Sequence, residues 1–452
     1  MKETRPNQAA TGKSKLNGLL DDLGLDSRQV PQVWQRAADL VLDSSDGQDR
    51  PALPILDPDR LLEYNALLGF DPACFATLVQ AAALIRADSS LERLFRVCTW
   101  SLYQSGLNPG QEAFKVPEPQ KSMAGLAGLF PVLILLAGLP AMIAFYDEHR
   151  IPRDILVATL GDMKIWMGDY VHKNGRYGIS AFWWLHRHLS CAIFRIGRLQ
   201  FIHNQFAGPV KAYRNKESRQ VCALSLQGIT YRIDGQVDGT NGIFDRQNAW
   251  TSSLLEQDGR VSGSPVCPRG TALKPEMALP RDHWLQVLAP GDGVLDIHIP
   301  EDGRLDHAAC GQSINQAIRF YQSCFPGLEV KAVTCATWLL DPQLQDILDA
   351  GANICRFQRE VYLYPIRSDD RQIFERVFHT TPDEVRRLKA DSKLQKAIIK
   401  YVRAGNRLHE AGMFLLAEDA AGWGSHAGPA YADCAMSPQI DQNTRVKQLQ
   451  GL

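Results

Sequence analysis

The first third of the chain repeats apolar residues every three or four positions, which is the spacing of amphipathic helices. Asp57 and Asp71 are each followed by proline. Aspartate caps helix N-termini and proline suits the first helical position, so we expect a helix to begin at each pair. The pattern predicts a helical domain over residues 31–180, after a poorly ordered polar segment over residues 1–30.

Beyond residue 180, short runs alternate apolar and polar residues, which is typical of β-strands. We expect strands over residues 191–206, 293–299, 329–336 and 353–365, with one or two more in residues 219–234 and another in residues 283–288. A long helix is expected after the strand at residues 293–299, with Asp306 as its N-cap. This order of strands and helices predicts a mixed α/β domain built on one main sheet.

The same pattern sets the expected domain limits. The α/β domain should extend over residues 181–365, with the glycine-, serine- and proline-rich residues 239–282 as a long excursion. A helical extension is expected over residues 366–416, and a polar tail over residues 417–452. The predicted fold class is therefore α+β, with a helical N-terminal domain followed by the α/β domain.

One apolar segment, residues 122–146, carries no charge and is long enough to cross a bilayer. Pro131 and Pro140 interrupt it, and no excess of lysine or arginine marks one flank as a topology signal would. We expect two short buried helices here, meeting near Pro140, and no membrane span.

Composition narrows the classes of function. Among 452 residues, 49 lysines and arginines nearly balance 50 aspartates and glutamates, so no global charge indicates a nucleic-acid partner. The ten cysteines include no C-x-x-C pair, which argues against a zinc knuckle or a disulfide framework. His186 and His188 have no third metal ligand nearby, so no metal is expected. With no apolar leader at the N-terminus, we expect a cytoplasmic protein.

Four short segments carry a resemblance to a known family. In combination, and in this order, they resemble the GNAT-like C-terminal domain of a bacterial acyltransferase family that places a helical N-acyltransferase N-terminal domain before it. The resemblance extends over about residues 50–415 and implies a GNAT-like fold for the α/β domain. The segments are "FRIGRLQF" (194–201), "LDIHIP" (295–300), "CGQSINQAIRFY" (310–321) and "CATWLLDPQL" (335–344).

The resemblance implies acyl-CoA as co-substrate. In GNAT proteins the pantetheine arm lies between two adjacent parallel strands that part, here expected at residues 293–299 and 329–336. The pyrophosphate lies on the turn and the helix N-terminus that follow the first strand. At that position Gly311, Gln312 and Ser313 are expected to present N–H groups to phosphate. The segment "HAACGQS" has one glycine, where GNAT enzymes usually carry R/Q-x-x-G-x-G/A.

Acyl transfer to an amine needs a base, because an ammonium has no lone pair with which to attack. His298 is the candidate base, with Asp296 two residues earlier on the same strand face, where its charge would raise the pKa of the imidazole. The alternative for His298 is a strand-edge histidine bonded to a turn. Cys335 is a candidate proton donor or nucleophile, or else a small buried apolar residue.

Three further residues are candidates for substrate binding. Arg198 and Gln200 are expected on one face of an inner strand, where the arginine would recognise a carboxylate or form a structural ion pair. Trp338 would form a wall of an acyl pocket or belong to the core.

These residues favour an acyltransferase that moves an acyl group from an acyl-CoA-like thioester to an amine of a small molecule or peptide by direct attack. A non-catalytic GNAT-fold protein that binds a CoA-like or peptide ligand is the alternative. A cysteine-dependent transferase or hydrolase using Cys335 or Cys310 has no recognisable cysteine–histidine motif to support it.

Overall fold

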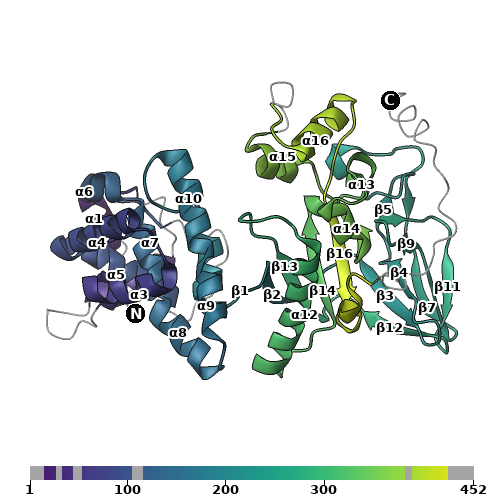
Figure 1. Ribbon diagram of the computed structural model, residues 1–452, viewed down its shortest axis with the longest axis horizontal. Helices are drawn as coiled ribbons and strands as arrows, with labels where there is room; N and C mark the ends of the chain where they lie inside the picture. The colour runs from purple at the N-terminus through teal and green to yellow at the C-terminus, as the bar shows by residue number, and fades with distance from the viewer. Residues whose placement is uncertain (1–14, 27–32, 44–52, 104–115, 382–388, 426–452) are drawn as a thin grey trace, which may run out of the picture. The chain divides into compact units, whose positions relative to one another are not determined.

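The computed structural model describes residues 15–26, 33–43, 53–103, 116–381 and 389–425 (Figure 1). The chain divides into two compact units, Met1–Arg195 and Ile196–Leu452.

The first unit is built from helices, as predicted. Helix α1 corrects one expectation: it lies inside the segment thought to be poorly ordered, and it buries Leu16, Leu19 and Leu20. Residues 1–14 and 27–30 of that segment lie outside the described residues. The helices are α1 (Lys15–Asp22), α2 (Val33–Asp43), α3 (Pro58–Leu68), α4 (Pro72–Ala87), α5 (Ser89–Tyr103), α6 (Gln120–Met123), α7 (Leu129–Leu136), α8 (Leu139–Glu148), α9 (Arg153–Leu160), α10 (Asp162–Asn174) and α11 (Phe182–Leu189).

Both Asp-Pro pairs begin helices. The Asp57 carboxylate accepts from the amide of Asp59 at 2.9 Å, at the start of α3. The Asp71 carboxylate accepts from the amide of Cys74 at 2.9 Å, at the start of α4. The capped starts predicted from the sequence are confirmed.

The apolar segment at residues 122–146 contains two helices, α7 and α8, after the end of α6 and a 3-10 helix at Ala124–Leu126. The two helices meet near Pro140 and all eight residues of α7 are buried, as predicted, but in α8 only Leu139, Met142 and Tyr146 are buried. Taken together, Leu129–Glu148 is long and apolar enough to span a membrane; its most apolar 18 residues have a mean hydropathy of 2.2, and 67% of them are buried inside the protein. The absence of a membrane span stays a prediction.

The second unit contains a six-stranded main sheet in the order β1-β2-β13-β14-β16-β15. Strands β13 and β14 pair in parallel and are neighbours, which confirms the central expectation from the sequence. The long helix α12 (His307–Cys324) connects them, and α14 (Asn353–Arg359) follows β14 (Figure 1). The strands are β1 (Phe194–Ile196), β2 (Leu199–Gln205), β13 (Gly293–His298), β14 (Ala332–Thr337), β15 (Tyr362–Pro365) and β16 (Ala411–Leu416).

A second, five-stranded sheet was not predicted. The expected excursion at residues 239–282 supplies many of the short strands in the minor sheets, because buried residues such as Val261, Val266 and Leu279 hold it against the rest of the unit. Two of its glycines, Gly259 and Gly270, adopt positive φ angles of 72° and 80° at turns between short strands. The five-stranded order is β10-β9-β4-β3-β12, beside the sheets β11-β8-β7 and β5-β6. The strands are β3 (Val210–Asn215), β4 (Val221–Ser225), β5 (Thr230–Tyr231), β6 (Trp250–Thr251), β7 (Leu254–Gln257), β8 (Arg260–Gly263), β9 (Pro265–Cys267), β10 (Thr271–Ala272), β11 (Met277–Pro280) and β12 (Trp284–Leu288).

The C-terminal part of the sheet shows that the α/β domain does not end at residue 365, as the sequence predicted. Helices α15 (Arg371–Phe378) and α16 (Lys393–Arg403) lie in the predicted helical extension, but the chain then returns as β16 between β14 and β15. The run "AGMFLL" of β16 is buried throughout, and a short apolar run cannot be assigned to strand or helix from periodicity alone. The predicted tail begins with an ordered 3-10 helix, η7 (Ala417–Gly422), and its residues 426–452 lie outside the described part.

Two predicted strands are also corrected. The segment 191–206 is a hairpin of β1 and β2, because Gly197 adopts a positive φ of 64° and turns the chain. The segment 353–365 is helix α14 followed by the shorter strand β15.

The main sheet packs against the second sheet. Val294 and Ala332 of the main sheet share one buried cluster with Val210 and Val266 of the second sheet. Helix α12 packs against β2, where Tyr321 donates to the carbonyl of Phe201 at 3.3 Å. This arrangement fixes the ends of β13 and β14, where the candidate site lies.

Candidate functional site

Strands β13 and β14 part before they end. Their parallel register stops at Asp296 and Thr334, although β13 continues to His298 and β14 to Thr337. Each strand keeps its outer partner: His298 still pairs with β2, and Thr337 still pairs with β16. The two inner edges therefore diverge, and their backbone N–H and C=O groups can pair with an extended ligand.

Cys335 lies at the point where the strands part. Its thiol donates a hydrogen bond to the carbonyl of Ile297 over 3.3 Å, and the residue is buried. Burial raises the pKa of the Cys335 thiol well above its usual range, and the nearby charges of Asp296 and Glu410 add to this effect. Because a thiolate is the reactive form of cysteine, this environment argues against Cys335 as a nucleophile.

Asp296, His298 and Gln200 lie on one face of neighbouring strands. Asp296 and His298 are two residues apart in β13, and Gln200 of β2 is the register partner of His298. The Thr334 hydroxyl donates to Asp296 Oδ1 at 3.3 Å. Gln200 is buried, whereas His298 is half-buried at the end of the strand. The structure thus brings the predicted base and its carboxylate together beside the opening.

Glu410 is a second carboxylate near the opening, and the sequence analysis missed it. It immediately precedes β16, whose first residue pairs with Thr337. The amide of Glu410 donates to Ser368 Oγ at 2.9 Å, which fixes its backbone. Burial raises the pKa of the Glu410 carboxyl, and the like charges of Asp369 and Glu375 raise it further. No motif surrounds Glu410 in the sequence, so only the fold could reveal it.

Arg198 holds the turn between β13 and α12. Its guanidinium donates to the carbonyls of Pro300, Gly303 and Arg304 at 2.6–2.7 Å. Arg198 lies in the hairpin turn before β2, so the predicted strand face shared with Gln200 is wrong. Arg198 therefore shapes the turn, and its guanidinium also lies 3.8 Å from Asp302 Oδ1, in a structural ion pair.

The N-terminus of α12 has the predicted N-cap, but its free backbone N–H groups are not those of the three residues predicted to bind phosphate. The Asp306 carboxylate accepts from the amide of Ala309 at 2.8 Å, as an N-cap does. Gly311 is the fifth residue of α12, and Gln312 and Ser313 follow it. Only the first four amides of a helix lack a partner within it, so these three bond inside the helix. The amides that an anion could reach belong to the first residues of α12 instead.

Gly311, Gln312 and Ser313 have different structural roles. A Cβ on Gly311 would lie 2.2 Å from Trp423 Cδ1, so glycine is needed for the close approach of that ring. Ser313 is buried, accepts from the amide of Leu199 at 3.1 Å and donates to the carbonyl of Ile196. Gln312 is exposed and lines a groove.

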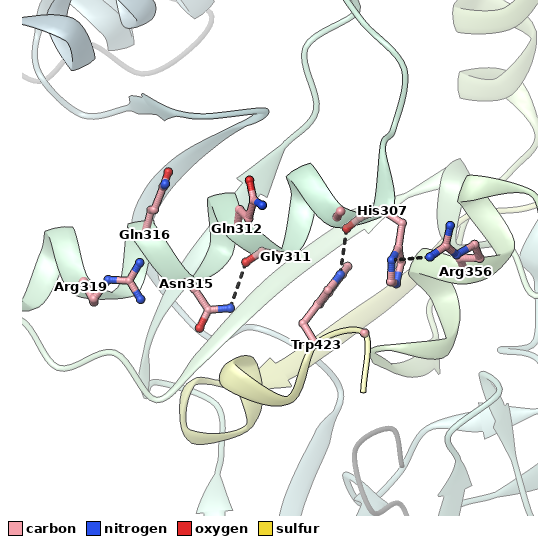
Figure 2. Close-up of a pocket in the computed structure, with 10 residues that line it drawn as sticks. His307, Gly311, Gln312, Asn315, Gln316, Arg319, Arg356 and Trp423 are labelled. Carbon is pink, nitrogen blue, oxygen red and sulfur yellow. Dashed lines mark hydrogen bonds between the residues drawn. The ribbon is translucent and has the colours of Figure 1, made fainter. Parts of the chain in front are cut away.

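The groove runs along α12 and has a volume of about 470 Å³ (Figure 2). Figure 2 shows Trp423 on one side of the helix, Gln312 and Gln316 on the other, and Arg356 beside the helix start. The Trp423 indole donates to the carbonyl of His307 at 2.9 Å, and Arg356 contacts His307 Nδ1 at 3.1 Å. The lining residues are His307, Ala308, Gly311, Gln312, Asn315, Gln316, Arg319, Arg356, Trp423 and Gly424.

Trp338 belongs to the core. It is 9% exposed in the 3-10 helix η5 (Trp338–Leu340) and packs in a cluster with Leu344, Phe374 and Leu408. An acyl-pocket wall at Trp338 has no support in this packing. Among the described residues, no group of three histidine, cysteine, aspartate or glutamate side chains could hold a metal ion.

The class of protein follows from the parted parallel strands, the connecting helix and the helical first unit. Residues 59–191 match the sequence model of the N-acyltransferase N-terminal domain, and residues 193–415 match that of the GNAT-like C-terminal domain. The chain belongs to the family that joins these two domains. No curated protein matches it in sequence.

Solved acyltransferase structures share this fold. One, in complex with decanoyl-CoA, has 20% sequence identity and a TM-score of 0.58, and the match covers 88% of this chain and 98% of that one. A complex of acyltransferase with decanoyl-CoA and teicoplanin has the same identity and coverage and a TM-score of 0.59. A third holds CoA and 10C-teicoplanin, again at 20% identity, with 88% and 98% coverage and a TM-score of 0.58.

Proposed function

We propose that this protein transfers an acyl group from acyl-CoA to an amine. The observation that carries the proposal is the parting of β13 and β14 beyond Asp296 and Thr334. The pantetheine arm of CoA contains two amide groups, and the open strand edges offer the backbone partners they need. The turn held by Arg198 and the start of α12 then lie where the pyrophosphate would follow.

The donor is proposed to carry a medium-length acyl chain. Similar structures hold decanoyl-CoA and octanoyl-CoA, which supports this length. The acceptor is proposed to be an amine on a small peptide-like molecule, since one similar structure holds teicoplanin together with decanoyl-CoA. The carboxyl groups of Asp369, Glu375 and Glu410 would attract a cationic amine toward the opening.

The chemistry is a direct attack. His298 takes a proton from the ammonium, the free amine attacks the thioester carbonyl carbon, and the carbon–sulfur bond breaks. The nitrogen loses a second proton as the bond breaks, and the CoA sulfur, which leaves with the bonding electron pair, takes up that proton, so amide and CoA thiol are the products. Cys335 stays protonated because burial raises its pKa, so it serves as a hydrogen-bond donor at the opening and not as an acyl carrier. A cytoplasmic location stays a prediction.

The test is release of free CoA thiol from decanoyl-CoA in the presence of a panel of amines, with the acylated product identified by mass spectrometry. We expect release that depends on the amine and falls sharply in His298→Ala. His283→Ala serves as the matched control, because this histidine is exposed beside β12 on the second sheet. Tight binding of acyl-CoA with no transfer to any amine would instead favour the non-catalytic binding protein.

A further inference from the structure

Tyr364 of β15 is a buried side chain whose hydroxyl has no hydrogen-bond partner. The residue is 5% exposed. Its ring meets Phe206 edge to face and stacks on Phe414, but among the described residues no group donates to the hydroxyl or accepts from it. A buried tyrosine usually bonds its O–H, because an unpaired hydroxyl loses its hydration without compensation. The hydroxyl is therefore available to a ligand, and its position decides which one.

The tip of the Tyr364 ring lies over Gly412 of the neighbouring strand β16. The two residues are register partners, and a Cβ added to Gly412 would lie 2.1 Å from Tyr364 Cε2 and 2.8 Å from the hydroxyl oxygen. Only glycine leaves this space open, so the Tyr364 side chain leans from the edge strand β15 across β16. Its hydroxyl end is directed toward β14, the strand that borders the opening.

Tyr364 belongs to a row of residues that crosses the main sheet on one face. Gly412 pairs with Ala336 of β14. His298 of β13 would be the parallel partner of Ala336 if the register of the two strands continued beyond Asp296 and Thr334. These residues share the face that packs against the second sheet, because each lies two or four positions from a member of the cluster buried there. Those members are Val294, Ala332, Phe414 and Tyr362.

A ligand can reach this row at Ala336. Ala336 is exposed, although Thr334 and Cys335 before it are buried. His298 and Gly412 are two strand spacings apart, about 10 Å before the parting of the strands adds to it. That span accommodates a thioester carbonyl and an amine, with the imidazole on one side and the Tyr364 hydroxyl on the other.

The surroundings of Tyr364 keep its proton in place. Burial raises the pKa of the Tyr364 phenol well above its usual range, and the nearby groups of Asp296 and Cys335 raise it further. A phenol is a weaker acid than a thiol even at its ordinary pKa, so Tyr364 is poorly suited to protonate the departing CoA sulfur. A hydroxyl that keeps its proton is suited to donate a hydrogen bond where negative charge develops on oxygen.

We propose that the Tyr364 hydroxyl donates a hydrogen bond to the thioester carbonyl oxygen of the acyl donor. When the amine attacks the carbonyl carbon, the π electrons move onto this oxygen, and the hydrogen bond strengthens as the negative charge grows. The proton stays on Tyr364, and the electron pair returns to the carbonyl as the carbon–sulfur bond breaks. Tyr364 is then a catalytic residue on the side of the opening opposite His298. This inference rests on the proposed function, because it assigns a contact to the same donor.

The test pairs two tyrosines of β15. Tyr364→Phe removes a hydroxyl that has no partner, so the melting temperature should stay near that of wild type. Its kcat with decanoyl-CoA should fall about 10²–10³-fold, the usual effect of losing one oxyanion donor. Tyr362→Phe is the matched control, because its hydroxyl donates to the carbonyl of Val266 and accepts from the amide of Ala223 at 3.1 Å, both in the second sheet. This control should melt lower and keep its kcat.

Infrared spectroscopy locates the hydrogen bond without turnover. Decanoyl-CoA, isotopically labelled at its thioester carbonyl, is bound to the wild-type protein and to both variants with no amine present. Difference spectra then record the carbonyl stretch of the bound donor. A hydrogen bond weakens the C=O bond, so the stretch should lie at lower frequency in wild type and in Tyr362→Phe than in Tyr364→Phe.

The outcomes separate this inference from the proposed function. Equal carbonyl frequencies in wild type and Tyr364→Phe would overturn it even if kcat falls, because the hydroxyl would then act on another atom. A Tyr364→Phe protein with the kcat of wild type would overturn it as well. Either result leaves acyl transfer in place. Failure of the wild-type protein to acylate any amine would overturn the proposed function and this inference together.

Discussion

Thr334 and Asp296 occupy the last position at which β14 and β13 pair, and the Thr334 hydroxyl donates to Asp296 Oδ1 over 3.3 Å. This hydrogen bond joins the two strands at the point from which they diverge. The Asp296 charge also raises the pKa of both the Cys335 thiol and the Tyr364 phenol, after the larger effect of burial. The Asp296 carboxylate thus adds to the electrostatics of the opening while its side chain is held by the neighbouring strand.

His298 is expected to act as the base. His298→Ala should lower kcat by about 10²–10⁴-fold, the usual contribution of a positioned general base, with a smaller effect on acyl-CoA binding. The wild-type rate should rise with pH as the His298 imidazole loses its proton, because only the neutral imidazole can accept a proton from the ammonium. The measurement is kcat against pH, with the melting temperature determined on the same preparation. If Glu410→Gln abolishes the reaction while His298→Ala leaves rate and pH profile intact, Glu410 is the base.

Cys335 is expected to be dispensable for the chemistry. Its thiol is buried and its pKa is raised, so little thiolate forms at neutral pH. Cys335→Ala should keep kcat within a few-fold of wild type and lower the melting temperature modestly, because a buried sulfur is lost. Intact-mass analysis during turnover should find no acylated enzyme. A thioester on Cys335, or a turnover lost from a well-folded Cys335→Ala protein, would reinstate the cysteine mechanism.

Gly311→Ala is expected to destabilise the second unit. The new Cβ would lie 2.2 Å from the ring of Trp423, so the ring or the helix must move, at a cost of about 1–3 kcal/mol. Gly168→Ala in α10 is the matched control, because a Cβ there has nothing within 4 Å. That change should stabilise its helix by up to about 1 kcal/mol, the helix-propensity difference between alanine and glycine.

A double-mutant cycle tests whether contact with Trp423 causes the destabilisation by Gly311→Ala. In a Trp423→Ala background, Gly311→Ala should no longer destabilise, because the ring it would meet is gone. Denaturant unfolding of the four proteins measures this. An equal penalty with and without the tryptophan would place the strain elsewhere in α12.

Glu410→Gln is expected to change how stability depends on pH. Burial and the charges of Asp369 and Glu375 raise the pKa of the Glu410 carboxyl in the folded protein, so folding favours its protonated form. Its contribution is therefore favourable below the unfolded pKa and is lost as pH rises through the folded pKa. The glutamine variant should melt higher than wild type at pH 7–8, and the gap should close as pH falls below about 4.5. A difference in melting temperature that does not change with pH would mean that the charge of Glu410 does not cause it.

Local signals in the sequence were sufficient for the elements that position the site. Asp57, Asp71 and Asp306 cap helices because their short carboxylates accept hydrogen bonds from the free amides of the first helical turn. The alternation around residues 293–299 and 329–336 identified β13 and β14, and the resemblance to the GNAT-like domain placed them side by side.

Contacts between residues distant in the sequence were not predictable in this way. Nothing near Gly311 indicates that Trp423 would cover it, and nothing near Arg198 indicates that its guanidinium would bind the turn at 300–304. Glu410 reaches the opening only because β16 enters the sheet beside β14. Each of these depends on tertiary packing, which local periodicity does not encode.

The position of β16 bears on the order of events during synthesis. Strands β14 and β15 are made first, but in the folded sheet they are not partners, because β16 lies between them. Each therefore presents an open edge to the cell until residue 416 has left the ribosome, and open edges invite pairing with other chains. We expect fragments that end before Ala411 to aggregate and to bind no acyl-CoA, so the nascent chain should depend on chaperones until its last strand arrives.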